Sequence, residues 1–128
     1  MSIPGLLGRR ILLVEDEVMI AMYLEELLED AGCVVVGPFS RVAAAVVAAG
    51  QEVVDAALLD VNLAGEKVYP AAEILATRGV PFLLLSGYGD KALPRNRLHW
   101  RCVEKPVDSV ELLATLASLI AVPSRLQL

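Results

Sequence analysis

Four chemically capable side chains each come directly after an apolar run of the sequence. They are two carboxylates, a hydroxyl and an ammonium group, those of Asp16, Asp60, Ser86 and Lys105. If the runs are parallel strands, their carboxyl ends meet at one edge of a sheet, where open parallel sheets bind ligands. Such a set of groups suits the handling of a phosphoryl group on a divalent metal ion.

A third acid, Glu15, precedes Asp16, so three carboxylates would end adjacent strands. Two unit negative charges about 5 Å apart repel by roughly 3 kcal/mol at an effective dielectric constant near 20. A divalent cation removes this conflict, and oxygen ligands with no His or Cys nearby favour Mg²⁺ over Zn²⁺. The turn-prone stretch 61–65 after Asp60 could add a backbone carbonyl ligand. The alternative is that Asp16 caps a helix and Asp60 begins a turn.

Asp60 could itself be the nucleophile, since carboxylates form aspartyl phosphates. The Ser86 hydroxyl and the Gly87 N–H could donate to a phosphoryl oxygen, and Lys105 could pair with Asp60 at rest and with that oxygen after transfer. Alternatively, Ser86 and Gly87 form an ordinary strand-end turn, and Lys105 is a surface lysine before a helix that starts at Pro106. A cis peptide bond is compatible with the 105–106 position.

The apolar runs alternate with helix-like segments, which predicts five strand–helix units. Strands are expected at about 10–14, 33–36, 55–59, 81–85 and 101–104, and helices at about 17–31, 40–50, 66–77 and 108–121. Pro94 allows only a short or bent helix within 89–99. Ser40 is an expected helix cap, and Asp108 and Glu111 have the spacing of a capping box.

This alternation predicts an α/β fold with a doubly wound, five-stranded parallel sheet. The second strand is expected to stop at Gly37-Pro38 without a reactive group, which makes it the natural edge strand and favours the flavodoxin-like order 2-1-3-4-5. The 128 residues suit a single domain with a core of about 9–121, and we expect no output domain.

Composition narrows the class of partner. The net charge of −5 argues against nonspecific binding to nucleic acid. No apolar run is long enough to span a membrane, and the first residues lack the features of a signal peptide. Cys33 and Cys102 are expected to be reduced thiols. We therefore expect a cytoplasmic protein without nucleic-acid or membrane partners.

Four stretches, at 11–17, 58–63, 86–87 and 105–106, resemble the conserved motifs of the receiver (CheY-like) domain of bacterial two-component response regulators. They occur in the family's order and spacing across almost the whole chain. The resemblance implies that Asp60 accepts a phosphoryl group from the phosphohistidine of a sensor histidine kinase or a phosphotransfer protein. In such a domain Ser86 would hydrogen-bond the phosphoryl group and Lys105 would neutralise it. The implied Mg²⁺ ligands are Glu15, Asp16, Asp60 and the backbone carbonyl of Asn62.

The resemblance also implies a phosphoprotein that signals through a downstream protein and is not an enzyme in the usual sense. It would catalyse only its own Mg²⁺-dependent phosphotransfer and dephosphorylation. Whether it forms a homodimer stays open.

Two departures from the family pattern concern how such a domain would switch. Cys102 occupies the place of the usual aromatic switch residue, three positions before the lysine. The stretch 81–89 is similar to a single-domain subfamily with a Phe-Ala-Thr-Gly-Tyr-like motif and an irregular fourth helix. Our hypothesis is that Tyr88 and a mobile 87–99 segment replace the missing switch; the alternative is that Tyr88 is a packed loop aromatic.

The stretch 91–101 is a candidate partner surface in an otherwise acidic chain, since arginine and aromatic residues are typical interface anchors. The alternative is a solvated loop with a locally buried Trp, and we interpret His99 as structural. The residues of the stretch are Lys91, Arg95, Arg97, His99, Trp100 and Arg101.

Three other functions compete with a phosphoacceptor. A pseudo-receiver would bind partners without phosphorylation. A phosphatase with an aspartate nucleophile would usually need a second Asp where Asn62 stands. A flavodoxin-like mononucleotide binder would need an early phosphate-binding loop, where the chain has Glu15, Asp16 and Glu17.

Overall fold

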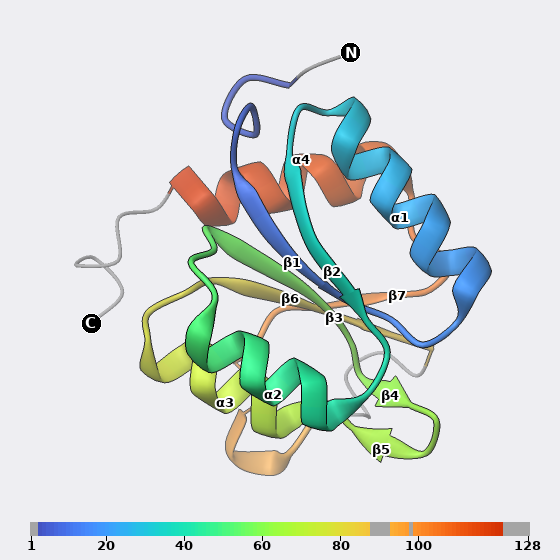
Figure 1. Cartoon of the computed structure of the whole chain (residues 1–128), viewed down its shortest axis with the longest axis vertical. Coiled ribbons are helices and arrows are strands. Elements are labelled where there is room, and N and C mark those ends of the chain that lie inside the picture. The colour runs from blue at the N-terminus through green and yellow to red at the C-terminus, as the bar shows by residue number, and fades with distance from the viewer. Residues whose placement is uncertain (1–2, 88–92, 98, 122–128) are drawn as a thin grey trace.

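The computed structural model describes residues 3–87, 93–97 and 99–121, and its centre is one parallel sheet (Figure 1). Its strands lie in the order β2-β1-β3-β6-β7, which is the predicted 2-1-3-4-5 order of a doubly wound sheet. The two candidate residues Tyr88 and Lys91 lie outside the described residues. The strands are β1 (Arg10–Val14), β2 (Val34–Phe39), β3 (Ala56–Asp60), β6 (Phe82–Ser86) and β7 (Cys102–Glu104).

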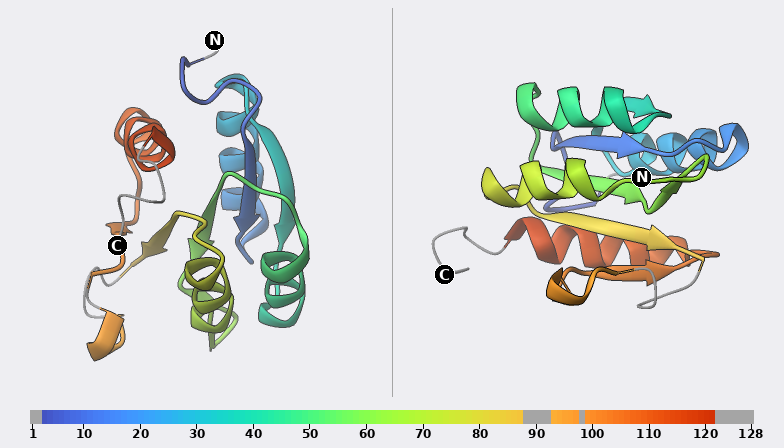
Figure 2. Two further views of the ribbon diagram at one scale, coloured as in Figure 1. Left: turned by 90° about the vertical axis from the view of Figure 1, so that its left-hand side faces the viewer. Right: turned by 90° about the horizontal axis from the view of Figure 1, so that it is seen from below.

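Helices cover both faces of this sheet (Figures 1 and 2). The helix α1 (Val18–Asp30) lies with α4 (Ser109–Ala121) on one face, and α2 (Val42–Gln51) lies with α3 (Tyr69–Thr77) on the other. Among the residues described between β6 and β7, a 3-10 turn, η2 (Arg95–Arg97), precedes β7, in agreement with the short helix that Pro94 predicts. Each helix among the described residues is too short or too polar to span a bilayer.

Alternation along the strands divides the interior into two cores. Ile11 and Leu13 of β1 pack beneath α1 and α4, whereas Leu12 and Val14 pack beneath α2 and α3. Successive side chains of a strand point to opposite faces, so a continuous apolar run can fill both cores at once. The prediction of a sheet covered on both faces, made from the continuous apolar runs, is therefore confirmed.

The edge strand β2 is longer than the sequence predicts. It continues through Gly37 and Pro38 to Phe39, and its register with β1 shifts between Leu12 and Val14. Gly37 has φ 114°, and a Cβ atom there would lie 2.7 Å from the carbonyl oxygen of Leu13. The expected strand end is thus wrong because glycine allows a bulge that brings the chain back into the sheet.

Two expected helix boundaries need correction. Ser40 does not cap α2, because Arg41 is at the N-cap position without a side-chain hydrogen bond, and the helix runs one residue beyond Gly50. At α4 the capping box is partly confirmed, since Asp108 Oδ2 accepts a hydrogen bond from the Glu111 N–H at 3.4 Å.

The third helix begins at Tyr69, not at 66, because a small hairpin takes up the residues before it. The strands β4 (Asn62–Leu63) and β5 (Glu66–Lys67) are antiparallel, and Ala64 and Gly65 between them have φ values of 52° and 94°. Two successive positive φ values are typical of tight two-residue hairpin turns. The Asn62 side chain accepts the Gly65 N–H at 3.0 Å, which stabilises this turn in place of a helix.

Candidate functional site

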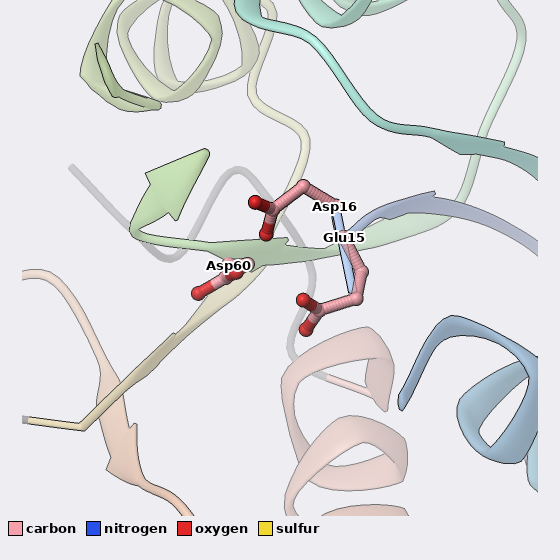
Figure 3. Close-up of side chains that lie close together, drawn as sticks. All are labelled: Glu15, Asp16 and Asp60. Carbon is pink, nitrogen blue, oxygen red and sulfur yellow. The ribbon is translucent and has the colours of Figure 1, made fainter. Parts of the chain in front are cut away.

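Three carboxylates meet at the carboxyl edge of the sheet. Glu15 and Asp16 follow β1, Asp60 ends β3, and one oxygen of each lies within 4.8 Å of the others (Figure 3). The register explains this meeting, because Val14 pairs with Leu59 and the next residues of the two strands are level. The structure therefore brings together the three acids that the sequence placed at adjacent strand ends.

Lys105 reaches the same place from the loop after β7. Its Nζ lies 3.0 Å from Glu15 Oε1 and 3.2 Å from Asp60 Oδ1. The Lys105 N–H donates to the carbonyl of Ser86 at 2.8 Å, which holds the loop against the end of β6. The sequence predicted the contact with Asp60 but not the second contact with Glu15. The peptide bond between Lys105 and Pro106 is cis.

The two acids beside Lys105 are almost completely buried. Glu15 is 2% exposed and Asp60 is 6% exposed. Burial, followed by the adjacent Glu15 carboxyl, raises the pKa of Asp60 to about 7, although Lys105 acts in the opposite direction. Burial lowers the pKa of Lys105, but its contacts with Glu15 and Asp60 outweigh this and leave the pKa raised. One lysine is thus not enough to stabilise both carboxylates in their charged form.

Asp16 does not cap the helix that follows it. Its Oδ2 accepts the Ala64 N–H at 3.0 Å, which ties the turn of the β4–β5 hairpin to the acidic cluster. Glu17 holds the N-cap position of α1 without a capping bond from its side chain. The Glu17 N–H instead donates to Glu15 Oε2 at 3.1 Å.

A cavity of about 170 Å³ opens beside Asp60. The buried Ser86 and the exposed Gly87 form one side of it, at the end of β6. Asn62 lines it as well, while its side-chain oxygen binds the Gly65 N–H. Sequence reasoning missed two further lining residues, Glu17 and Lys67.

The donor atoms of the cluster suit a hard divalent cation. Among the described residues the grouped ligands are carboxylates alone, and no His or Cys belongs to the group. Mg²⁺ prefers such oxygen ligands and commonly uses only a few protein carboxylates. A buried Asp60 with a raised pKa is also the kind of group whose charged form a cation stabilises.

Similarity to known proteins agrees with this geometry. The sequence of residues 11–117 matches the family model of the response regulator receiver domain. The chain belongs to this family. Receiver domains are the signalling modules of two-component systems, and they bind Mg²⁺ in an acidic pocket.

Several solved receiver structures are similar to this chain. SdrG from Sphingomonas melonis Fr1 is 37% identical, with a TM-score of 0.75, over 94% of this chain and 100% of that chain. SdrG from Pseudomonas melonis Fr1, in a BeF3-activated conformation, is 36% identical, with a TM-score of 0.72 and the same coverage. The receiver domain of the sensor histidine kinase PA1611 from Pseudomonas aeruginosa, with magnesium in its active site cleft, is 28% identical. Its TM-score is 0.74, over 90% of this chain and 99% of that chain. No curated protein matches the chain.

The stretch before β7 is partly an internal packing element. Trp100 is 8% exposed and packs edge-on against Phe82, with ring centroids 5.3 Å apart. Arg97 lies over the Trp100 ring and pairs with Glu73 of α3 through two hydrogen bonds. The alternative of a locally buried Trp is therefore confirmed for Trp100, and Arg97, which the sequence did not single out for such a role, also contacts the domain itself.

Other residues of the stretch are turned outward. Arg95, His99 and Arg101 are exposed, and they keep the interface hypothesis open. Cys102 pairs with Leu84 in the sheet and packs partly buried against the same core as Trp100. An aromatic cluster thus lies beside the position where receivers usually carry their switch residue.

Proposed function

We propose that this receiver is a phosphoacceptor and that Asp60 takes a phosphoryl group from the phosphohistidine of a sensor histidine kinase or a phosphotransfer protein. The observation that carries the proposal is the meeting of Asp60 with two further carboxylates and with Lys105 Nζ at 3.2 Å. An acceptor, a cation site and a neutralising lysine are the parts that such a transfer needs.

Glu15, Asp16, Asp60 and the carbonyl of Asn62 would hold Mg²⁺. When bound, the ion supplies positive charge that stabilises the oxygens of the transferring group. The similar PA1611 receiver, which holds magnesium in its active site cleft, supports this assignment.

The transfer is a displacement at phosphorus. A carboxylate oxygen of Asp60 attacks the phosphorus atom, the P–N bond to the donor imidazole breaks, and the imidazole nitrogen keeps the electron pair. Ser86 and the Gly87 N–H donate hydrogen bonds to the phosphoryl oxygens, while Lys105 moves its contact from the carboxylate to one of these oxygens. Their contribution is positioning and charge neutralisation, and hydrolysis of the acyl phosphate by water resets the domain.

Mass spectrometry tests the proposal directly. The protein is incubated with Mg²⁺ and acetyl phosphate, beside an Asp60→Asn variant. We expect the parent alone to gain the mass of one phosphoryl group, because Asp60 lines the cavity beside the acidic cluster and Lys105. A parent that gains no mass, or a variant that gains as much, would contradict the assignment.

Cys102 gives a specific reason to test a second function. Without an aromatic ring at this position, the domain could bind its partner in one conformation only, as a pseudo-receiver does. Partner affinity that is equal for the unmodified and the BeF3-treated protein would favour this alternative. Continuous turnover of many donor equivalents would instead favour a phosphatase.

We place the protein in the cytoplasm, where it would act as a receiver in a two-component signalling system. Its output would be a contact with a downstream protein, and neither nucleic acid nor membrane is required.

A further inference from the structure

One lysine lines the cavity around Asp60 without belonging to any of the four sequence motifs. Lys67 lies on β5, and the structure places it with Asn62 and Lys105 around the cavity. In the strand register it pairs with Asn62. Directly opposed residues of an antiparallel pair project to the same face, so the hairpin presents both side chains together.

The hairpin holds this position through three hydrogen bonds at its base and turn. The Val68 N–H donates to the carbonyl of Val61 at 2.9 Å, and the turn amides of Ala64 and Gly65 donate to Asp16 and Asn62, each at 3.0 Å. One of these bonds joins the turn to an acid of the proposed metal site. The backbone of Lys67 is therefore fixed relative to the acceptor pocket, although its side chain is exposed.

The charges of the pocket leave a role for another cation. One divalent ion and Lys105 would just balance the three carboxylates, and the Lys105 ammonium is already shared between Glu15 and Asp60. A doubly charged phosphoryl donor adds negative charge, and Glu17 on the cavity wall adds more. In the described part of the chain Lys67 has no ion-pair partner of its own, so its charge is available to an incoming anion.

We propose that Lys67 is a second cation of the acceptor pocket and contacts the phosphoryl oxygens of the incoming donor. This inference rests on the function proposed above. Lys105 neutralises charge from the β7 side of Asp60, and Lys67 does so from the hairpin side. An anion between the two ammonium groups is held in front of the Asp60 carboxylate, which favours the attack on phosphorus.

The rate of phosphorylation by acetyl phosphate tests this role. In this reaction an Asp60 oxygen attacks phosphorus, the bond from phosphorus to the acetyl oxygen breaks, and acetate leaves with the electron pair. We expect Lys67→Gln to lower the second-order rate about two- to fivefold, the range that a solvent-exposed charge pair supports. Lys67→Arg, which keeps the charge, should retain most of the parent rate. The difference between parent and Lys67→Gln should shrink at high ionic strength, because salt screens an exposed charge.

Arg9→Gln is the matched control, since it makes the same change of net charge at the amino ends of the strands, and the cavity lies at their carboxyl ends. Arg9 is exposed and lies 3.6 Å from Asp55, in a surface pair remote from the cavity. We expect it to keep the parent rate. The role of Lys67 would be overturned if Lys67→Gln reacted as fast as the parent, or if Lys67→Gln and Arg9→Gln lost rate equally. Neither result would affect the proposed phosphoacceptor function. A parent that acetyl phosphate does not modify would overturn the proposed function together with this inference.

Discussion

At the scale of single residues, the acidic cluster carries a conflict that its function would use. Asp60 and Glu15 share one lysine in a buried place, and the pKa of Asp60 is raised to about 7. A carboxyl that is hard to ionise alone becomes a good nucleophile when a cation holds its charged form. The burial and repulsion of these carboxylates therefore favour Mg²⁺ binding, and they lower the stability of the metal-free fold.

The raised pKa predicts how stability depends on pH in metal-free protein. The folded state keeps the Asp60 proton up to about pH 7, whereas an unfolded aspartate loses it near pH 3.9. Between these values the folded state binds more protons, so the contribution of this carboxyl to stability falls as the pH rises from about 4 to 7. Urea unfolding in the presence of a chelator measures this effect. The free energy of unfolding should fall from pH 5 to pH 8, and the fall should be about 1–3 kcal/mol smaller in Asp60→Asn than in the parent. Equal losses in both proteins would contradict the raised pKa.

At the scale of elements, two glycines have opposite roles, although the sequence predicts an element end at each of them. Gly37 enables the bulge of β2 at a positive φ, where a Cβ atom would meet the carbonyl of Leu13. Gly50 lies exposed inside α2, and a Cβ atom there would meet only Ile74 Cγ2, at 4.0 Å. The first glycine is required by its conformation, and the second one weakens a helix.

Alanine substitution should separate these roles. Gly37→Ala is expected to lower the free energy of unfolding by about 1–3 kcal/mol, because it combines a strained φ with a backbone clash. Gly50→Ala is expected to raise it by about 0.5–1 kcal/mol, because alanine is the better helix former. Chemical denaturation of both variants beside the parent measures the two effects. A Gly37→Ala variant as stable as the parent would show that the bulge does not depend on Gly37, and a Gly50→Ala variant less stable than the parent would contradict the helix argument.

At the scale of the whole molecule, the site exists only in the folded chain. Its acids follow β1 and end β3, its lysine follows β7, and Lys67 and the turn amides come from the β4–β5 hairpin. A ligand that binds only the folded state stabilises it, and each tenfold excess of free ligand over its dissociation constant adds about 1.4 kcal/mol.

Mg²⁺ should therefore raise the melting temperature of the domain. We expect a rise of about 3–6 °C for each kcal/mol of binding, and its loss in Asp16→Asn. Glu66→Gln removes an exposed acid of the same hairpin that does not belong to the cluster, and it should keep the rise. Thermal melts with and without Mg²⁺ give the increment for each variant, independently of how stable the metal-free variants are. An unchanged increment in Asp16→Asn would remove this residue from the metal site.

The sequence by itself determined the strand order and the meeting of the motif residues. Apolar runs that bury both faces leave few options other than a parallel sheet, and parallel strands bring Asp16, Asp60 and Lys105 to one edge. Turn and capping residues predicted the ends of helices and strands less well where an end depends on a contact with a distant residue. Gly37-Pro38 reads as a strand end, and 66–68 reads as the start of a helix, until Leu13 and Asp16 are placed beside them.

Only the tertiary structure decided the details that set the chemistry. The sharing of Lys105 between two buried acids, the place of Lys67 in the cavity wall and the burial of Trp100 between Phe82 and α3 all depend on distances between remote segments. Periodicity reports which side of an element is apolar, because burial acts on each residue separately. It does not report which charged groups share a pocket, because that depends on how the strands and loops are registered against one another.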